Sequence, residues 1–229
     1  MRLNAEFDKR VVIRPDDYTW VASPANGVRR MMLDRVGDEV ARATTIVQFE
    51  PDSWFDAHAH GGGEEFLVLE GTFSDETGDY PAGTYVRNPI GTSHTPHTVD
   101  GCTIFVKLHQ FAPDDDRQFH LDTKQAEFEA GLFPGQSVLP LHSAPDEDVR
   151  LERLQPGTAL PSESHEGGAE ILVLEGSFED EFGAYPKGTW IRLPKGATHS
   201  PGSQSGCLLY IKSGHLAAPD LARWTATEA

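Results

Sequence analysis

The sequence predicts an all-β protein made of two similar barrels in tandem, and three observations support this. Residues 66–107 align without a gap with residues 171–212, and 21 of the 42 paired positions are identical, each pair separated by 105 residues. Short apolar runs in each copy are separated by Gly, Pro and Asp, which is typical of antiparallel strands joined by tight turns. Helical periodicity is scarce. Each copy is expected to curl into a barrel, because an open sheet would leave its edges uncovered.

The first copy carries its expected strands as apolar runs at residues 44–49, 65–71, 83–89 and 102–108. The segment before these runs, residues 10–35, has no close match at the start of the second copy. We therefore expect this segment to add strands to the first barrel or to pair across the two.

Three histidines and a glutamate stand close to these runs. Alternate residues of a strand face the same side, so the imidazoles of His58 and His60 point the same way, and Glu64 keeps their parity. His94 follows the next strand. Three imidazoles and one carboxylate on neighbouring strands suit a first-row divalent ion and leave positions open for water or substrate. The sequence therefore predicts a metal site at His58, His60, Glu64 and His94.

The spacing of these residues resembles the cupin family. The first cupin motif, G-x5-H-x-H-x3,4-E-x6-G, is matched over residues 52–71, and the second, G-x5-P-x-G-x2-H-x3-N, over residues 83–98. Asp52 and Thr98 replace the leading Gly and the final Asn. Within cupins, the stretch GGEEFLVLEG and the residues after it resemble the cupin domain of ChrR-type anti-sigma factors and their stand-alone relatives. The resemblance covers both copies and implies a bicupin, with two jelly-roll barrels of the double-stranded β-helix type.

The second copy keeps the motif frames at residues 157–176 and 188–203 but not all of the ligands. His165 and His199 are retained, whereas Glu163 stands where the first histidine is expected and Ala169 stands where the glutamate is expected.

The choice of the glutamate has one open alternative. Three glycines at residues 61–63 could bulge the strand and reverse its parity, in which case Glu65 and its counterpart Glu170 would be the ligands. Strand parity and the spacing to Gly71 favour Glu64. We expect a weaker second site at His165, Glu170 and His199.

The polar stretch that follows the first copy predicts the domain boundary. We expect an N-terminal barrel over residues 1–112, a linker over residues 113–135 with a short helix at 122–133, and a C-terminal barrel over residues 136–229.

Composition excludes several classes of partner. The formal net charge of −17 disfavours both nucleic acid and anionic membranes. The sequence has neither an apolar run long enough to span a bilayer nor an apolar leader, so we expect a cytoplasmic protein. Two distant cysteines, Cys102 and Cys207, support neither a disulfide framework nor a cysteine zinc module.

The expected cofactor is one divalent transition metal, with zinc or iron as the first choices and manganese or nickel also compatible with the donors. The resemblance to ChrR-type cupins implies a stress-sensing or regulatory role. The alternative is a metal-dependent enzyme, such as a cupin dioxygenase acting on a small oxygenated substrate, by analogy of fold.

The expected partners are a small-molecule ligand or substrate and a protein. Regulators of the ChrR type carry a helical module with a His/Cys zinc site, which has no counterpart in this sequence, so direct binding to a sigma factor is not expected. A homodimer is compatible with this fold, because the edges of small barrels are commonly covered by another copy.

Overall fold

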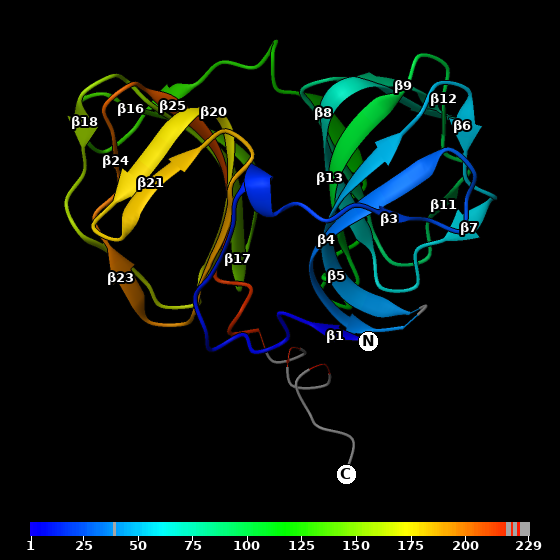
Figure 1. The fold of residues 1–229 in the computed structure, drawn as a ribbon, viewed down its shortest axis with the longest axis horizontal. Helices are drawn as coiled ribbons and strands as arrows, with labels where there is room; N and C mark the ends of the chain where they lie inside the picture. The colour runs from blue at the N-terminus through cyan, green and yellow to red at the C-terminus, as the bar shows by residue number, and fades with distance from the viewer. Residues whose placement is uncertain (39, 219–220, 222–223, 225–229) are drawn as a thin grey trace. The chain divides into compact units, whose positions relative to one another are not determined.

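The computed structural model describes residues 1–38, 40–218, 221 and 224 of the 229-residue chain. It confirms the all-β fold and divides into two compact units (Figure 1). The first unit consists of Met1–Ala5 and Thr19–Ala126, and the second of Glu6–Tyr18 and Glu127–Ala229. The end of the expected second barrel, at residues 219–220, 222–223 and 225–229, lies outside the described residues.

The first unit is a jelly roll whose main sheet has the order β1-β4-β5-β13-β8-β10-β14. Its strands are β1 (Arg2–Leu3), β3 (Val21–Ala22), β4 (Val28–Gly37), β5 (Ala41–Phe49), β6 (Ser53–Trp54), β7 (His58–Ala59), β8 (Glu64–Asp75), β9 (Gly78–Pro81), β10 (Thr84–Asn88), β11 (Ser93–His94), β12 (His97–Thr98), β13 (Cys102–Leu108) and β14 (Phe119–Asp122). Beside the main sheet, β7 pairs with β11, and β12 pairs with β6 and β8.

The long strand β8 serves two layers of this barrel. Its first half pairs with β13 and β10, and its last residues pair with β9 and β12. Gly71 lies where the pairing changes; its φ is +69°, and a Cβ there would lie 2.0 Å from the carbonyl oxygen of Gly101. Only glycine fits both the backbone conformation and the space, which explains the glycine at the end of the first motif.

The second unit repeats this plan with the main sheet order β15-β16-β17-β25-β20-β22-β2. Its elements are β2 (Val11–Ile13), the 3-10 turn η1 (Pro15–Asp17), β15 (Glu129–Ala130), β16 (Gln136–Ala144), β17 (Glu147–Leu154), β18 (Thr158–Ala159), β19 (Glu163–His165), β20 (Ala169–Asp180), β21 (Gly183–Pro186), β22 (Trp190–Leu193), β23 (Ala197–His199), β24 (Gly202–Ser203) and β25 (Cys207–Ser213). β19 pairs with β23, as β7 pairs with β11 in the first unit.

Each barrel takes its last sheet strand from the segment that precedes the other repeat. β2 lies before the first repeat but pairs with β22, and β14 lies before the second repeat but pairs with β10. The N-terminal segment therefore does both things that we expected of it, since β3 and β4 add to the first barrel and β2 to the second. Residues 6–18 group with the second unit, which differs from a first barrel over all of residues 1–112.

The short helix expected at residues 122–133 is wrong. This stretch holds the end of β14, a series of turns and β15. Pairing of β14 with β10 and of β15 with β16 overrides the helix propensity of its Lys, Gln, Ala and Glu residues.

The two barrel interiors differ in composition. The first core is rich in aromatic rings, including Phe49, Phe66, Phe73 and Tyr80. The second core is mainly aliphatic, and Ala169 and Leu193 belong to it. The polar side chains of the first barrel that correspond to this pair lie at the candidate site described next.

Candidate metal centre

Short strands at one end of the first barrel carry the histidines. His58 begins β7 and pairs directly with His94 on β11. The backbone N–H of His60 donates to the carbonyl of Thr92, which extends this contact past the end of β7. His60 and His94 are buried, whereas His58 is exposed. One member of the cluster therefore faces solvent while the others are enclosed.

The structure brings together all four residues predicted for the first site. One potential donor atom from each of His58, His60, Glu64 and His94 lies within 4.8 Å of the others. The ring centroids of the three histidines are 4.6 to 5.4 Å apart. Glu64 Oε1 lies 3.5 Å from both His60 Nε2 and His94 Nε2.

Hydrogen bonds at Nδ1 orient the His60 ring. Thr92 Oγ1 donates to the carbonyl of Pro89 at 2.7 Å, so its lone pairs are left to accept from His60 Nδ1 at 2.8 Å. The proton of His60 is therefore assigned to Nδ1, and its Nε2 keeps a lone pair that faces the cluster.

Oxygen atoms also lie beside Nδ1 of the other two histidines. His58 Nδ1 lies 2.9 Å from the carbonyl oxygen of Asp56, and His94 Nδ1 lies 3.3 Å from Asp75 Oδ2. Each of these oxygens can accept a hydrogen bond from the ring beside it.

The converging atoms have no hydrogen-bond partners of their own. His60 Nε2, His94 Nε2 and Glu64 Oε1 are buried and unpaired. Leaving buried polar atoms unpaired is unfavourable by about 1–3 kcal/mol each, so such a group indicates a binding site. Two imidazole nitrogens and a carboxylate oxygen, with exposed His58 beside them, fit a divalent transition metal.

The pKa values follow from the same burial. Burial raises the pKa of Glu64 to about 7, although a hydrogen bond with Asn88 acts to lower this pKa. Burial and the neighbouring imidazoles of His94 and His58 lower the pKa of His60 to about 3. Burial and His58 also lower the pKa of His94, although Asp75 opposes this. The buried imidazoles are therefore in the neutral form that a metal requires.

Glu65 lies on the opposite face of β8 and does not join the cluster. The pairing of β8 with β10 is regular from Glu64 onward, so neighbouring residues face opposite sides. Glu65 Oε2 accepts hydrogen bonds from Tyr85 Oη at 2.6 Å and Arg87 Nη1 at 2.8 Å. The glycines at 61–63 form the turn before β8 and leave the strand parity unchanged.

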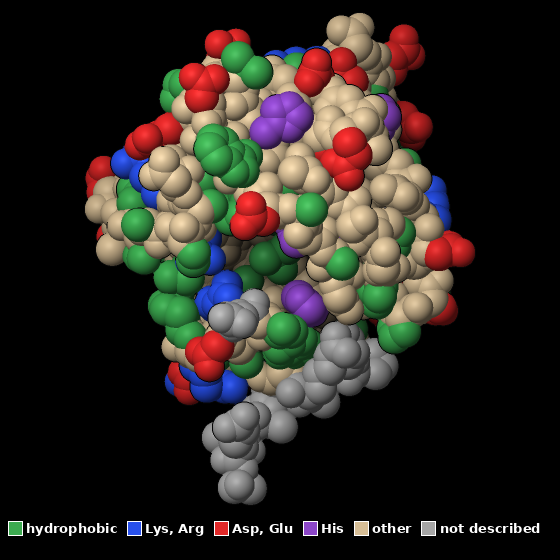
Figure 2. Space-filling view, turned by 90° about the vertical axis from the view of Figure 1, so that its right-hand side faces the viewer, with side chains coloured by type: hydrophobic (Ala, Val, Ile, Leu, Met, Phe, Trp, Pro, Cys, Tyr) green, Lys and Arg blue, Asp and Glu red, His purple; other side chains and the backbone are tan. Residues whose placement is uncertain are grey.

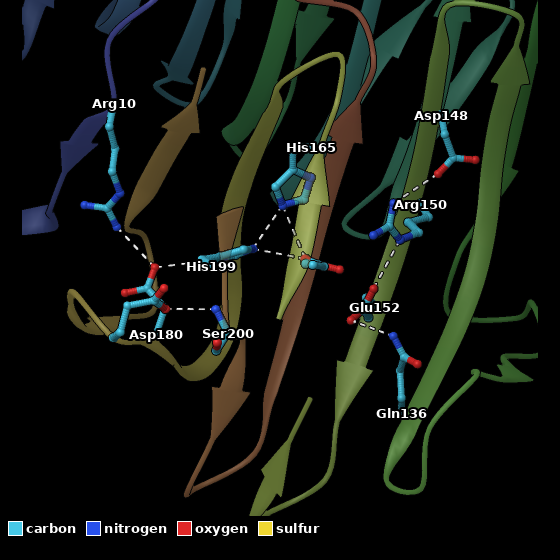
Figure 3. A network of polar contacts seen from close by, with 11 residues as sticks. Arg10, Gln136, Asp148, Arg150, Glu152, His165, Asp180, His199 and Ser200 are labelled. Carbon is cyan, nitrogen blue, oxygen red and sulfur yellow. Dashed lines mark hydrogen bonds and ion pairs between the residues drawn. The ribbon is translucent and has the colours of Figure 1, made fainter. Parts of the chain in front are cut away.

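The second barrel gathers a different set of three residues, which are Glu163, His165 and His199. His165 Nε2 lies 3.0 Å from His199 Nε2, and Glu163 Oε1 lies 3.0 Å from His199 Nε2 and 3.3 Å from His165 Nε2. Figure 3 shows the rings of His165 and His199 pointing at each other. The donors of this cluster therefore bond one another, unlike those of the first barrel.

Glu170 corrects our expectation for the second site. It faces away from His165 and His199, and its carboxylate contacts Trp190 Nε1 at 3.2 Å and His215 Nε2 at 3.0 Å. The alternation of side chains along β20 matches that along β8, so Glu170 corresponds to Glu65 and lies on the face of β20 away from the histidines.

Glu163 is the residue that sequence reasoning missed as a potential ligand. Burial acts to raise its pKa, but hydrogen bonds with His165 and His199 hold this pKa well below the usual range of a glutamate. The signal that could have found it is its alignment with His58, since a carboxylate can replace an imidazole as a donor.

The polar surroundings of the first site are missing from the second. Glu64, Asn88 and Thr92 are replaced there by Ala169, Leu193 and Ala197. The second barrel has thus lost one donor, the amide that bonds it, and the hydroxyl that orients one of the histidines.

The approach to the first site is from solvent. His97 on β12 is exposed, and β12 pairs with β6 at Trp54, which is also exposed. Figure 2 looks at the first unit from the side of β7 and β11 and shows histidine side chains around a hollow with hydrophobic side chains beside it. We assign His97 to the rim rather than to the donor set.

A comparison with protein-family models identifies the chain. The model described as the ChrR cupin-like domain matches twice, over residues 8–112 and 116–217. The chain belongs to the ChrR cupin-like family. The expected bicupin architecture is confirmed. The first ChrR cupin-like match begins before β2, which pairs in the second barrel, and the second match begins before β14, which pairs in the first barrel.

Solved structures share the fold of this ChrR cupin-like protein at low identity. A “putative dioxygenase” from Nostoc punctiforme has a TM-score of 0.77 and 14% identity, covering 92% of this chain and 85% of that one. Ylba from E. coli has a TM-score of 0.69 and 14% identity, with 92% and 93% covered. Oxalate decarboxylase from Bacillus subtilis has a TM-score of 0.63 and 13% identity, with 91% and 79% covered.

Two further searches have negative results. No curated protein matches this chain in sequence. Among the described residues, no helix has the length and apolar character needed to cross a membrane.

Proposed function

We propose that this chain is a divalent-metal-binding bicupin with one working site, formed by His58, His60, Glu64 and His94 in the first barrel. The observation that carries this proposal is the convergence of buried, unpaired donor atoms from His60, His94 and Glu64. Zinc or iron suits this mixture of nitrogen and oxygen donors, and manganese or nickel is compatible with it.

A stress-sensing or regulatory role is the first candidate for this site. The support for it is membership of the ChrR cupin-like family. In this role the bound metal would supply a centre whose release or oxidation reports a chemical stress. The chain's own contribution is to hold the imidazoles neutral and their Nε2 atoms aimed at one point.

Catalysis is the second candidate, favoured by the exposure of His58. Because this ligand faces solvent while the others are buried, a small oxygenated substrate has an open approach to the metal. A bound divalent ion would supply Lewis-acid or oxygen chemistry at this position. The similar structures named as a dioxygenase and as oxalate decarboxylase support the enzyme alternative at the level of fold.

Elemental analysis of the untagged protein tests the metal proposal. We expect about one metal per chain in the wild type, loss in His60→Ala, and retention in the matched variant His165→Ala. No metal in the wild type after reconstitution with zinc, iron, manganese or nickel would contradict the proposal. Metal lost equally in both variants would contradict the assignment to the first barrel.

The two roles differ in their response to oxidants and substrates. A sensor should lose metal or change its circular dichroism on treatment with peroxide, without turnover. An enzyme should consume oxygen or release carbon dioxide with small oxygenated acids, and its rate should disappear in His60→Ala. The partner of a sensor would be a protein, and its capture should depend on metal loading.

A further inference from the structure

The dipeptide Asp75–Glu76, at the end of β8, occurs again as Asp180–Glu181 at the end of β20. It lies outside both cupin motifs. In each barrel it contacts the strand that carries the last histidine of the cluster, which is His94 or His199.

Both residues of the dipeptide hold this histidine strand. Asp75 Oδ2 lies 3.3 Å from His94 Nδ1, and Glu76 Oε2 accepts the backbone N–H of Thr95 at 2.8 Å. In the second barrel Asp180 Oδ2 lies 3.4 Å from His199 Nδ1, and the N–H of Ser200 donates to Glu181 at 2.8 Å (Figure 3). The side-chain contact fixes the ring, and the backbone contact fixes the strand.

We propose that Asp75 is a positioning residue for metal binding, which acts by holding the proton of His94 on Nδ1 and so keeping Nε2 free as the donor. This inference rests on the proposed metal site. It adds a residue that touches no metal to the four that would.

The second oxygen of Asp75 explains why its orientation is fixed. Oδ1 accepts from the backbone N–H of Thr77 at 2.8 Å and from Thr77 Oγ1 at 2.6 Å. Because both donors occupy Oδ1, the remaining oxygen, Oδ2, is presented to His94. The side chain is 6% exposed, so water offers little competition for this contact. A carboxylate on the far nitrogen of a ligating histidine also increases its basicity as a donor.

The second barrel uses the same carboxylate differently. Asp180 Oδ2 also contacts Arg10 Nη2 at 3.2 Å. The tyrosine contact is shared, since Tyr185 Oη donates to Asp180 Oδ1 at 2.7 Å and Tyr80 Oη to Asp75 Oδ1 at 3.4 Å. Figure 3 shows Arg10 and His199 approaching Asp180 from opposite sides. Arg10 therefore competes with His199 for the negative charge of Asp180.

The position of Arg10 is filled by a neutral residue in the first barrel. Val11 pairs with Arg192 and Phe119 pairs with Arg87, so the residues just before them, Arg10 and Gln118, are equivalent. Gln118 donates to Asn88 at 3.3 Å instead of contacting Asp75. Within the described part of the chain, the carboxylate of Asp75 thus has no arginine beside it and is left to His94, Thr77 and Tyr80, which suits a working metal site.

Asp75→Asn is the sharpest test, because it changes the hydrogen-bond pattern with little change in shape. The donors of Thr77 hold the amide oxygen at the Oδ1 position, which places the amide NH2 against His94. The ring must then accept at Nδ1 and carry its proton on Nε2, where the metal should bind.

We expect Asp75→Asn to weaken zinc binding, measured by chelator competition, by about 10- to 100-fold. The matched change Asp180→Asn, in the other barrel, should leave the affinity of the first site within about twofold. Melting of the metal-free proteins separates loss of fold from loss of positioning. An affinity of Asp75→Asn equal to that of the wild type would overturn the inference.

A second measurement needs no variant and no metal. Nitrogen-15 chemical shifts of the metal-free wild type report the tautomer of His94, which we expect to be the Nδ1–H form. Finding the Nε2–H form would overturn the inference even if zinc binds. If the wild type binds no metal, the proposed function fails by itself, and the tautomer still decides whether Asp75 orients the ring.

Discussion

Glu64 and Glu65 are neighbours in the chain but have opposite chemical environments. Glu64 faces the histidine cluster with an unpaired oxygen, whereas Glu65 is fully buried against Arg87 and Tyr85. Strand alternation alone produces this separation. One carboxylate is thereby available to a cation, and the other is committed to holding the sheet together.

Exchanging each glutamate for glutamine should separate the two roles. We expect Glu64→Gln to lose the metal while keeping its fold. Glu65→Gln should keep the metal but lower the free energy of unfolding by about 3 kcal/mol, because it breaks a buried ion pair. Metal content and urea denaturation measure the two effects. The reverse pattern would mean that Glu65 is the ligand.

The raised pKa of Glu64 makes the stability of the metal-free protein depend on pH. Its pKa rises from 4.5 to about 7 on folding, so the folded protein holds this proton more tightly than the unfolded chain does. The stabilising contribution is present below the unfolded pKa and declines as pH rises from about 4.5 through about 7. The lowered pKa of His60 acts in the opposite direction between about 3 and 6.5.

Comparison with Glu64→Gln isolates the carboxylate from the histidine. In the presence of a chelator, the melting temperature of the wild type relative to this variant should fall as the pH rises from 4.5 to 7. A constant difference across this range would show that Glu64 titrates normally.

At the scale of single elements, Gly71 allows β8 to pair with strands of two layers. Gly71→Ala should destabilise the first unit through both the positive φ and the contact with the carbonyl of Gly101. Gly196→Ala is a suitable control, because Gly196 has a similar φ of +76° and nothing within 4 Å of an added Cβ.

We expect the control to lose about 1–2 kcal/mol from backbone strain alone, and Gly71→Ala to lose more. Urea denaturation of the two variants measures the difference. Equal losses would mean that the contact with Gly101 relaxes without penalty.

The elements also show where sequence reasoning succeeds and where it stops. The repeat is found by comparing the sequence with itself, and the strand runs and the parity of Glu64 are read directly from neighbouring residues. The failed helix at 122–133 and the pairing of β2 with β22 depend on partners distant in sequence. The misassigned Glu170 shows that a glutamate missing from a motif is not replaced by its neighbour in sequence, since the carboxylate that joins His165 and His199 is that of Glu163 on β19.

At the scale of the whole molecule, one ancestral site exists in two chemical states. The first barrel keeps unpaired donors. In the second barrel the donors contact one another, Ala169 stands in place of the donor Glu64, and Leu193 stands in place of Asn88. The scaffold around both clusters is the same, including the carboxylate on the last histidine. The difference in metal binding should therefore be reversible by a few substitutions.

We expect the triple variant Glu163→His, Ala169→Glu and Leu193→Asn to bind a second metal. It restores the donors of the first barrel together with the amide that accompanies Glu64. The metal content measured by elemental analysis should rise from about one to about two metals per chain. The variant without Leu193→Asn serves as a control for the amide, and a metal content unchanged in both would show that other differences close the second site.

The exchange of β2 and β14 imposes an order on folding during synthesis. β14 at Phe119–Asp122 emerges from the ribosome after the first repeat, so the first barrel gains its final sheet strand last. β2, among the earliest residues made, stays without its partner until β22 at Trp190–Leu193 has emerged. The nascent chain therefore completes its two barrels in succession, and a chain cut between the first repeat and β14 would leave each half without one strand of its main sheet.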